Sequence, residues 1–464
     1  MNLFSKKDLN LAKEKNSKSD LQKNLTVIDL IFMGIGGIIG TGIFVFTGII
    51  ANKYSGPSIV LSYTIAGLVC LVVALVYSEI ASMLPVSGGI YSYSYIVFGR
   101  IFAWFFAGVL AAQFLFGSAA VASGWSAYMV GIIKSAGFEL PMEFTKIPAH
   151  GGIVNLPAII IICFCAFALY MGTKESKKIN NALVVIKILA IFTFIFVATP
   201  NFRIENWEDF MPYGFDNTLV GASILFFAYN GFNVIATASE ECKNPKRDVS
   251  IGLIGSILIT AIIYIAVGAL ATGIVSYKDL EGPEALAHAL RMNGSTVGVL
   301  IVSVGAVCGM TTVLLMQMYG MSRIFYVMSR DGMMPEILVK LNKRDSPSFS
   351  VALIAILLII LAGFFPFDLI GQLASMAGLL DYAMVSLIAI ILRFKHPNIE
   401  RKFKCPAIFV LGPMAFVSCF YLMYKQAFQN GEMMLIAKVF IAWLIGFTAL
   451  YFVITPFIGN KSEK

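Results

Sequence analysis

Charged residues are scarce in this chain of 464 residues. Asp, Glu, Lys and Arg together make up 13% of it, whereas hydrophobic residues make up 58%. An average soluble domain contains about 25% charged residues, so this composition excludes a soluble globule of ordinary usage and makes length a poor guide to domain number. The composition predicts a polytopic membrane protein.

Histidine and cysteine are also sparse. The three histidines, His150, His288 and His396, fall in predicted loops far apart in the sequence, which gives no support to a metal site or a catalytic histidine. The seven cysteines lie in apolar segments or in loops that we place in the cytosol, so extracellular disulfides are not expected. We predict no catalytic residue, no metal and no cofactor.

Long apolar runs are abundant. Runs of roughly 20 residues are read as membrane-spanning helices, and about twelve can be counted. They cover residues 27–50, 57–81, 101–133, 156–172, 181–199, 217–238, 250–274, 296–327, 349–366, 369–393, 406–425 and 434–457. Residues 1–24 are polar and lack the apolar core of a signal peptide, so we predict a short cytosolic tail there.

Lys and Arg are distributed unevenly between the predicted loops. With the N-terminus inside, the cytosolic side carries 24 of them and the outer side carries 7. The positive-inside rule then places both termini, including a C-terminal tail at 459–464, in the cytosol, and the protein in the cytoplasmic membrane. The net charge of +8 follows from this topology and from attraction to lipid, and no nucleic acid partner is predicted.

The first apolar run contains five glycines between positions 34 and 42. Each would cost about 1 kcal/mol in a helix interior, so the helix is predicted to open near Ile38 to Gly42. Backbone opened at membrane depth must face protein or a water-filled cavity, because lipid cannot satisfy its N–H and C=O groups. An alternative is that the glycines only let a neighbouring helix pack closely.

A break of this kind has a definite chemistry. One half-helix presents unpaired N–H groups with the positive end of its dipole, and the other presents unpaired carbonyls. Such a pair of ends can hold a carboxylate and an ammonium group together, as many secondary transporters do with amino acids near the membrane midplane.

The sixth run repeats this irregularity. Its apolar sequence is interrupted by Tyr-Asn-Gly-Phe-Asn at 229–233, and Asn-Gly is a strong helix breaker, so a second break is predicted over Phe227 to Asn233. Two broken helices five spans apart indicate an inverted repeat of five plus five helices, with the binding site between the breaks. The repeats would cover about 27–199 and 217–393 within a core at 25–393, and residues 394–458 would add two peripheral helices.

Two of the ionisable residues within predicted spans, Lys187 and Asp381, are considered as candidates for function. Lys187 is the only basic residue well inside the first five spans, and an intramembrane charge is a functional hypothesis by default. The alternative is that its long side chain extends to the cytosolic interface. Asp381 starts or interrupts the tenth span, where a capping or interfacial role is an alternative to a functional one.

Several motifs resemble a known family. They are Gly36 to Phe44 (GGIIGTGIF), Tyr77 to Ile80 (YSEI) with Pro85 to Tyr91 (PVSGGIY), and Glu240 to Asp248 (EECKNPKRD). In this order they are similar to the amino acid–polyamine–organocation (APC) superfamily, whose fold is the LeuT-like inverted repeat. Trp125 and the long eighth span ending in Ser322-Arg323 are similar to its cationic amino acid transporter branch.

The resemblance implies roles for residues at both breaks. The carboxylate of the substrate would be bound in the first break and its amino group by carbonyls from both. The implied substrate-binding residues are Ile38, Gly40, Thr41, Gly42, Phe227 and Asn230. Phe227 also matches an aromatic gate. Lys187 matches the fifth-span lysine that replaces sodium in proton-coupled relatives.

The chain departs from that branch at two positions. Gln113 stands where a glutamate is usual, and Asn233 where an acid is usual. Amides hold no charge, so these two positions favour a neutral amino acid over a cationic one. If the eighth span packs as in the family, the side-chain pocket is lined further by Phe226, Cys308 and Met310. The alternative is a cationic substrate held by carbonyls and retained water.

The predicted function is therefore secondary active amino acid transport by alternating access, as proton-coupled symport. The predicted partners are the amino acid, protons and the lipid bilayer; the oligomeric state is left open. An exchanger of cationic amino acids is the alternative. A membrane-embedded enzyme is more remote, because the spans hold no His-Glu zinc pair, aspartate pair or serine with its base. A receptor or channel is equally remote, because two broken helices are more than a receptor needs and charge rings are missing.

Overall fold

The computed structural model describes residues 4–7, 23–84, 88–282, 284–399, 401–429 and 432–458. Most of the predicted tail at 1–24, the whole tail at 459–464, and residues 85–87 of one family motif lie outside the described residues. Helices make up nearly all of the described part, and the strands β1 (Phe428–Gln429) and β2 (Glu432–Met433) form one short antiparallel pair.

All twelve predicted spans correspond to helical segments. The first comprises α2 (Val27–Ile38), the π-helical turn η1 (Gly42–Phe46), α3 (Thr47–Ile50) and a second π-helical turn η2 (Ala51–Ser55), and the sixth comprises α9 (Gly214–Tyr229) and α10 (Val234–Thr237). The others are α4 (Ile59–Met83), α6 (Arg100–Ser135), α7 (Leu156–Tyr170), α8 (Thr173–Ala198), α11 (Pro245–Ile274), α13 (Thr296–Arg330), α14 (Ser348–Phe364), α15 (Phe367–Lys395), α16 (Ile408–Ala427) and α17 (Leu435–Ile458).

Shorter elements connect these segments. They are the helices α5 (Ile90–Val97) and α12 (Ala285–Met292), and the 3₁₀ turns η3 (Gly56–Ser58), η4 (Met142–Phe144), η5 (Pro148–His150), η6 (Thr199–Asn201), η7 (Ile204–Trp207), η8 (Ser239–Glu241), η9 (Tyr277–Asp279) and η10 (Glu336–Val339). Within the described residues, nine helical stretches are long and apolar enough to cross a membrane, and one of them, Val27–Met83, contains two spans. The helices α7 and α14 are apolar but shorter. The protein is therefore an all-α polytopic membrane protein, as predicted.

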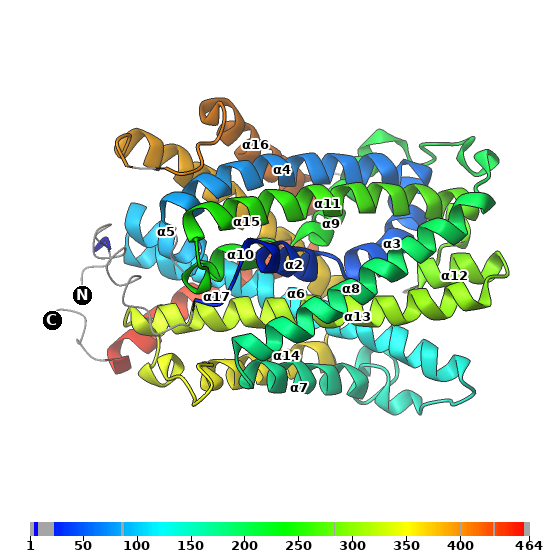
Figure 1. Ribbon diagram of the computed structural model, residues 1–464, viewed down its shortest axis with the longest axis horizontal. Coiled ribbons are helices and arrows are strands. Elements are labelled where there is room, and N and C mark those ends of the chain that lie inside the picture. The colour runs from blue at the N-terminus through cyan, green and yellow to red at the C-terminus, as the bar shows by residue number, and fades with distance from the viewer. Residues whose placement is uncertain are drawn as a thin grey trace.

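The helices run along the long axis of the molecule, with the two broken segments in the middle (Figure 1). The α4–α11 pair and the α7–α14 pair lie on opposite sides of them, and α13 packs against both α6 and α8. The outward faces carry exposed apolar side chains such as Phe196, Ile262 and Val410. A surface of this kind is suited to lipid, whereas the polar groups lie inside.

Ion pairs gather at one end of the bundle, which we call the basic end. Arg323 Nε lies 2.6 Å from Glu241 Oε1, and Arg330 donates to both oxygens of Glu240 at 3.0 Å. Other pairs there are Lys7–Asp331, Lys177–Asp29, Arg393–Glu79 and Arg401–Glu79. These pairs join segments that are distant in the sequence, so they hold the basic end closed.

Both central helices are interrupted where the sequence predicts it. The helix α2 ends at Ile38, Ile39 is extended with φ −75° and ψ 104°, and helix resumes at Thr41. The helix α9 continues to Tyr229, two residues further than the predicted start of the break, and Asn230 is extended with φ −62° and ψ 140°. The two interruptions are therefore as short as two to four residues, at 39–40 and 230–233.

The two breaks touch each other through backbone atoms. A Cβ added to Gly37 would lie 3.0 Å from the Gly231 carbonyl oxygen, and one added to Gly231 would overlap the Gly37 carbonyl. Gly231 also has φ +119°, a conformation that an L-residue rarely adopts. Glycine is required at 231 both by the backbone angle and by the close approach.

Gly231→Ala is expected to destabilise the protein. Backbone strain of this kind costs on the order of 1–3 kcal/mol, and the clash with Gly37 adds to it. The thermal unfolding temperature of the detergent-purified variant should fall. Gly446→Ala is the matched control, since a Cβ there meets no described atom within 4 Å and alanine favours helix over glycine, so this variant should not lower the unfolding temperature. Equal unfolding temperatures for both variants would contradict the close contact.

Candidate functional site

The first break is held by Lys187 of α8. This side chain is 0% exposed, and four oxygens surround its Nζ. They are the carbonyls of Ile35 (2.9 Å), Gly36 (3.2 Å) and Ile39 (2.8 Å), and the hydroxyl of Thr312 in α13 (2.8 Å). A helix end that cannot reach water needs such donors, because its last carbonyls have no partner inside the helix. Lys187 therefore caps the broken end of α2 instead of extending to the membrane interface.

Tyrosine hydroxyls supply the remaining donors around the breaks. Tyr264 of α11 lies 3.0 Å from the Ile38 carbonyl and 2.9 Å from the Ala228 carbonyl, so it bridges the two broken segments. Tyr63 donates to the Gly42 carbonyl at 3.0 Å. Sequence reasoning did not find Tyr264, Tyr63 or Thr312, because nothing local marks a tyrosine or threonine in an apolar run as the partner of a distant carbonyl.

The helix after the first break begins with N–H donors that have no hydrogen-bond partner among the described residues. Its first hydrogen bonds run from the N–H groups of Ile43 and Phe44 to the Gly40 carbonyl, each at 3.2 Å. The N–H groups of Thr41 and Gly42 precede these bonds, so they are the donors that a helix N-terminus leaves unpaired. Together with the positive end of the helix dipole, they suit an anion such as a carboxylate.

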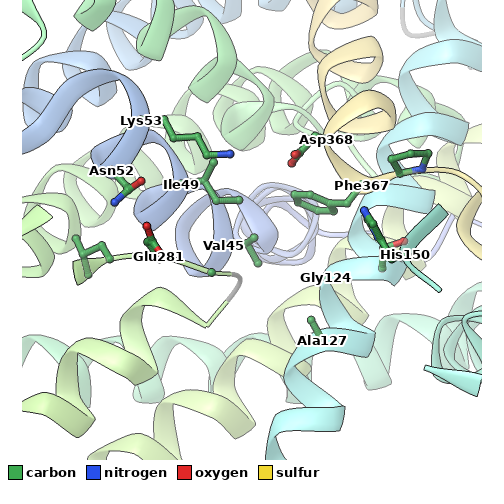
Figure 2. Close-up of a pocket in the computed structure, with 14 residues that line it drawn as sticks. Val45, Ile49, Asn52, Lys53, Gly124, Ala127, His150, Glu281, Phe367 and Asp368 are labelled. Atoms are coloured by element: carbon green, nitrogen blue, oxygen red, sulfur yellow. The ribbon is translucent and has the colours of Figure 1, made fainter. Parts of the chain in front are cut away.

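A cavity of about 540 Å³ lies on the side of the breaks away from the basic end. Figure 2 shows Lys53, Asp368 and Glu281 around it, with Val45 and Gly124 on its inner wall. Gly124 is in direct contact with Thr41, since a Cβ there would lie 2.6 Å from the Thr41 Cγ2. The cavity therefore extends from the surface to residues that pack on the first break.

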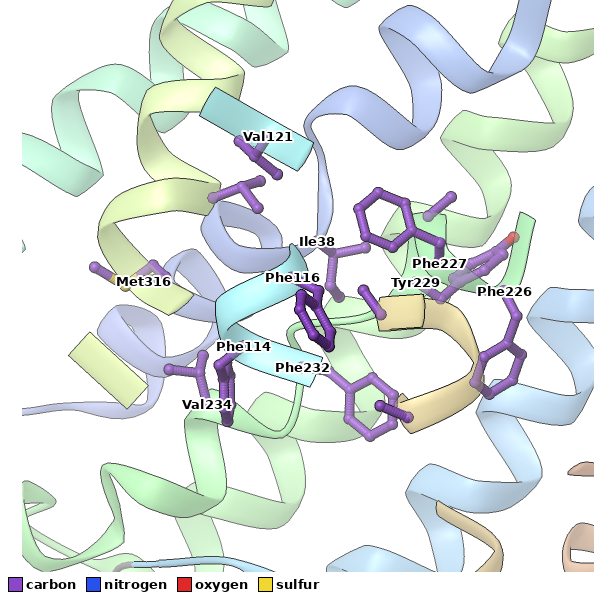
Figure 3. Close-up of a cluster of buried hydrophobic side chains, with 14 of the residues drawn as sticks. Ile38, Phe114, Phe116, Val121, Phe226, Phe227, Tyr229, Phe232, Val234 and Met316 are labelled. Carbon is purple, nitrogen blue, oxygen red and sulfur yellow. The ribbon is translucent and has the colours of Figure 1, made fainter. Parts of the chain in front are cut away.

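Two neighbouring phenylalanines of α9 have different surroundings. The Phe227 ring lies 5.1 Å from Phe46, which in turn lies 5.2 Å from Phe367 in the cavity wall. Phe226 packs instead against Tyr382 of α15, at 5.6 Å. Figure 3 shows Phe227 near Ile38 and Phe226 directed away from it. The structure thus brings Phe227 to the first break but does not bring Phe226 there.

The side chains of Gln113 and Asn233 form a hydrogen bond at the end of the second break that lies towards the basic end. The Asn233 side-chain amide donates to Gln113 Oε1 and to Asp381 Oδ2, both at 3.0 Å, and Gln113 Nε2 donates to the Tyr382 hydroxyl at 3.2 Å. Asp381 is fully buried in the middle of α15, which is continuous through this position. The expectation that Asp381 starts or interrupts its helix is wrong, and so is the capping or interfacial alternative.

The remaining predicted residues are Asn230 at the second break, Met310 near the first break, and Cys308 in α13. The Asn230 side-chain amide donates to the Ala374 carbonyl of α15 at 3.1 Å, so this side chain links the second break to α15. Met310 lies beside Gly124 near the first break, with its sulfur 3.3 Å from a Cβ built on that glycine. Cys308 is partly buried, one turn of α13 away from Thr312.

Comparison with protein families shows to which family this helical bundle belongs. Residues 25–459 match the model of the amino acid permease family, which is part of the APC superfamily. The chain belongs to this family. Its members are transporters and not enzymes, and the broken central helices are accordingly the parts of a permease.

Three relatives show which kinds of transporter are similar to this permease. A branched-chain amino acid permease of Bacillus subtilis is 35% identical over 457 residues, 97% of each chain. A methylthioribose transporter of the same organism is 35% identical over 426 residues, 91% of this chain and 92% of that protein. Cationic amino acid transporter 9 of Arabidopsis thaliana is 34% identical over 339 residues, 71% of this chain and 59% of that protein.

Gly42→Ala is expected to weaken ligand binding by the permease. The new Cβ would overlap Ala228 of α9 and push the two broken segments apart at the free N–H groups. A displacement of that kind should raise the dissociation constant of a transported ligand at least about tenfold, or about 1.4 kcal/mol. Isothermal titration or ligand-induced thermal stabilisation measures it. Adding Ala228→Gly removes one of the clashing atoms and should recover part of the affinity; no loss in Gly42→Ala would contradict the assignment.

Proposed function

We propose that this permease is a secondary active transporter that carries a neutral amino acid, bound between the two broken helices, in symport with a proton. The observation that carries the proposal is the direct contact of the breaks, Gly37 against Gly231, with free N–H groups on one side of the contact and helix-end carbonyls on the other. A zwitterion presents the complementary charges.

The two ends of the zwitterion would be bound by different half-helices. The N–H groups of Thr41 and Gly42 would take the carboxylate, and Gly40 lets the chain turn there. The carbonyls of Ile38, Phe227 and Asn230 would take the ammonium group, because a carbonyl oxygen has two lone pairs and can accept a second hydrogen bond beside the Tyr264 hydroxyl on Ile38. The order is supported by helix polarity, which places anions at N-termini and cations at C-termini.

Access from the cavity supports alternating access. The cavity reaches residues that pack on the first break from one side, while ion pairs join the segments of the basic end on the other. The excess of Lys and Arg at the basic end supports a cytosolic location for that end and for both termini, in the cytoplasmic membrane. The conformation described is then open towards the outside, and release of substrate inside requires the pairs at Glu240 and Glu241 to part.

The proposed core for this movement is the ten-helix unit at 25–393, built of repeats at about 27–199 and 217–393. The helices of residues 394–458 lie beside it, with α16 packed on α15 and α4 and with α17 packed on α6.

Proton coupling is assigned to Lys187. Within the described residues its Nζ has oxygen partners but no carboxylate within 4 Å. An ammonium group in the membrane interior without an anion is costly, so loss of its proton becomes accessible there. Charged, Lys187 holds α8 and α13 to the end of α2; neutral, it would let these segments separate.

The substrate is proposed to be neutral because Gln113 and Asn233 are amides and the neighbouring acid, Asp381, is already engaged by the Asn233 amide. Counterflow in proteoliposomes with a panel of radiolabelled amino acids tests this directly. We expect uptake of alanine, serine or a branched-chain amino acid, and little competition by arginine or lysine. Strong competition by arginine or lysine with none by neutral amino acids would overturn the neutral assignment, and no uptake of any amino acid would overturn the function.

Lys187→Ala is expected to abolish proton coupling while leaving substrate exchange partly active. Proton-driven accumulation should lose its dependence on external pH, because the titrating group is gone, while counterflow should persist in part. Uptake at two pH values in proteoliposomes measures both. Lys438→Ala removes a lysine that lies exposed in α17 and serves as the matched control, with wild-type pH dependence expected. Unchanged proton-driven accumulation in Lys187→Ala would remove Lys187 from the coupling mechanism.

A further inference from the structure

Asp381 is a buried acid to which the proposed mechanism gives no role. It lies near the middle of α15, with no exposed surface and no Lys, Arg or His within 4 Å among the described residues. Its Oδ2 accepts the Asn233 amide at 3.0 Å, and its Oδ1 has no partner in the described part of the chain. A carboxylate in this setting would be a buried charge stabilised by a single amide donor.

A second buried atom without a partner, on Asn233, indicates the protonation state of Asp381. Asn233 Oδ1 is also buried and without a hydrogen-bond partner among the described residues. Both atoms are acceptors when Asp381 is ionised, so neither can satisfy the other. If Asp381 is protonated, its hydroxyl becomes a donor, and the acid and amide groups are complementary: N–H to Oδ2 in one direction and O–H to Oδ1 in the other.

We propose that Asp381 is a proton-binding site, whose carboxyl group is protonated in this conformation and donates a hydrogen bond to Asn233 Oδ1. One proton then satisfies two buried polar atoms, each of which would otherwise carry the desolvation cost of an unpaired polar group. It also removes the much larger cost of an unpaired charge in the membrane interior.

The elements around Asp381 supply no compensating charge. Among the described residues, the titratable side chains near it are Tyr77 from α4, Tyr93 from α5, Cys419 from α16 and the adjacent Tyr382. From α6 comes the neutral Gln113. The nearest ion pair on the same helix is Arg393–Glu79, twelve residues or roughly 18 Å further along α15.

A route for the proton is suggested by other unpaired hydroxyls. The buried hydroxyls of Tyr77 and Tyr93, on the side of the basic end, have no hydrogen-bond partner among the described residues. Their rings lie 6.1 Å apart. When the basic end opens, water that reaches these hydroxyls would stabilise ionised Asp381 and accept its proton. The second break would thus carry its own proton site, as Lys187 serves the first.

Protonation itself can be measured without transport. Infrared spectra of purified protein at neutral pH should contain a protonated-carboxyl band that is missing in Asp381→Asn, a change that keeps the shape of the side chain. Asp216→Asn alters an exposed carboxylate and is the matched control, with no loss of this band expected. Identical spectra of wild type and Asp381→Asn in this region would overturn the proposal.

An exchange of the two side chains tests the pair. Asn233→Asp combined with Asp381→Asn restores one acid and one amide with their places reversed, and we expect the protonated-carboxyl band to return relative to Asp381→Asn alone. A missing band in the folded double variant would contradict the pairing.

The consequence for transport rests on the proposed function and is tested separately. In Asp381→Asn, counterflow should respond less to internal pH than in wild type, because the group that releases a proton inside is absent. An unchanged response to internal pH would remove Asp381 from coupling. Because infrared spectra report the proton and counterflow reports transport, failure of one proposal is distinguishable from failure of the other.

Discussion

Every polar backbone group inside a membrane must find a partner within the protein, and this requirement governs the centre of the molecule. Two helices that are interrupted at 39–40 and 230–233 expose N–H and C=O groups where lipid offers none. The surrounding helices satisfy the carbonyls with Lys187 from α8 and the hydroxyls of Tyr63 and Tyr264 from α4 and α11. The N–H groups of Thr41 and Gly42 have no such partner among the described residues, so the opened backbone offers donors to a ligand.

The distribution of charge follows from the same requirement. Most charged side chains in the described residues lie at the ends of the bundle, where arginines and acids are paired or water is near. Lys187 and Asp381 are exceptions, and each lies against one of the breaks. Ionisable groups in the membrane interior are rare, and they are typical of substrate pathways and proton relays. The position of these two beside the breaks supports the proposed link between protonation and the broken helices.

Sequence reasoning reached the spans, both breaks and Lys187 as a residue to single out, because these depend on local signals. A run of apolar residues, a cluster of glycines, an Asn-Gly pair and a lone lysine can each be recognised within about 20 residues. Asp381 is visible as a charge, but the prediction that it starts or interrupts its helix is wrong, and its role is left open between capping and function. Its contact with Asn233 joins positions 148 residues apart, and no periodicity within either helix specifies which helix will lie opposite.

Phe226 and Phe227 show the same limit at close range. Consecutive residues of a helix point about 100° apart, so only one of them can face the first break. The apolar pattern of α9 does not distinguish them, since both faces of this central helix are buried. The helices packed around α9 decide the question, and they place Phe227 against Phe46 and Phe226 against Tyr382.

Tyr264 carries a consequence for movement. Its hydroxyl has a single hydrogen but two acceptors at nearly equal distance, Ile38 on one broken helix and Ala228 on the other. If the two segments shift in opposite directions, the hydrogen can rotate to whichever carbonyl stays near, and one bond is always kept. The Tyr264 hydroxyl can therefore keep one hydrogen bond while the two half-helices shift slightly against each other, and such small displacements cost little hydrogen-bond energy.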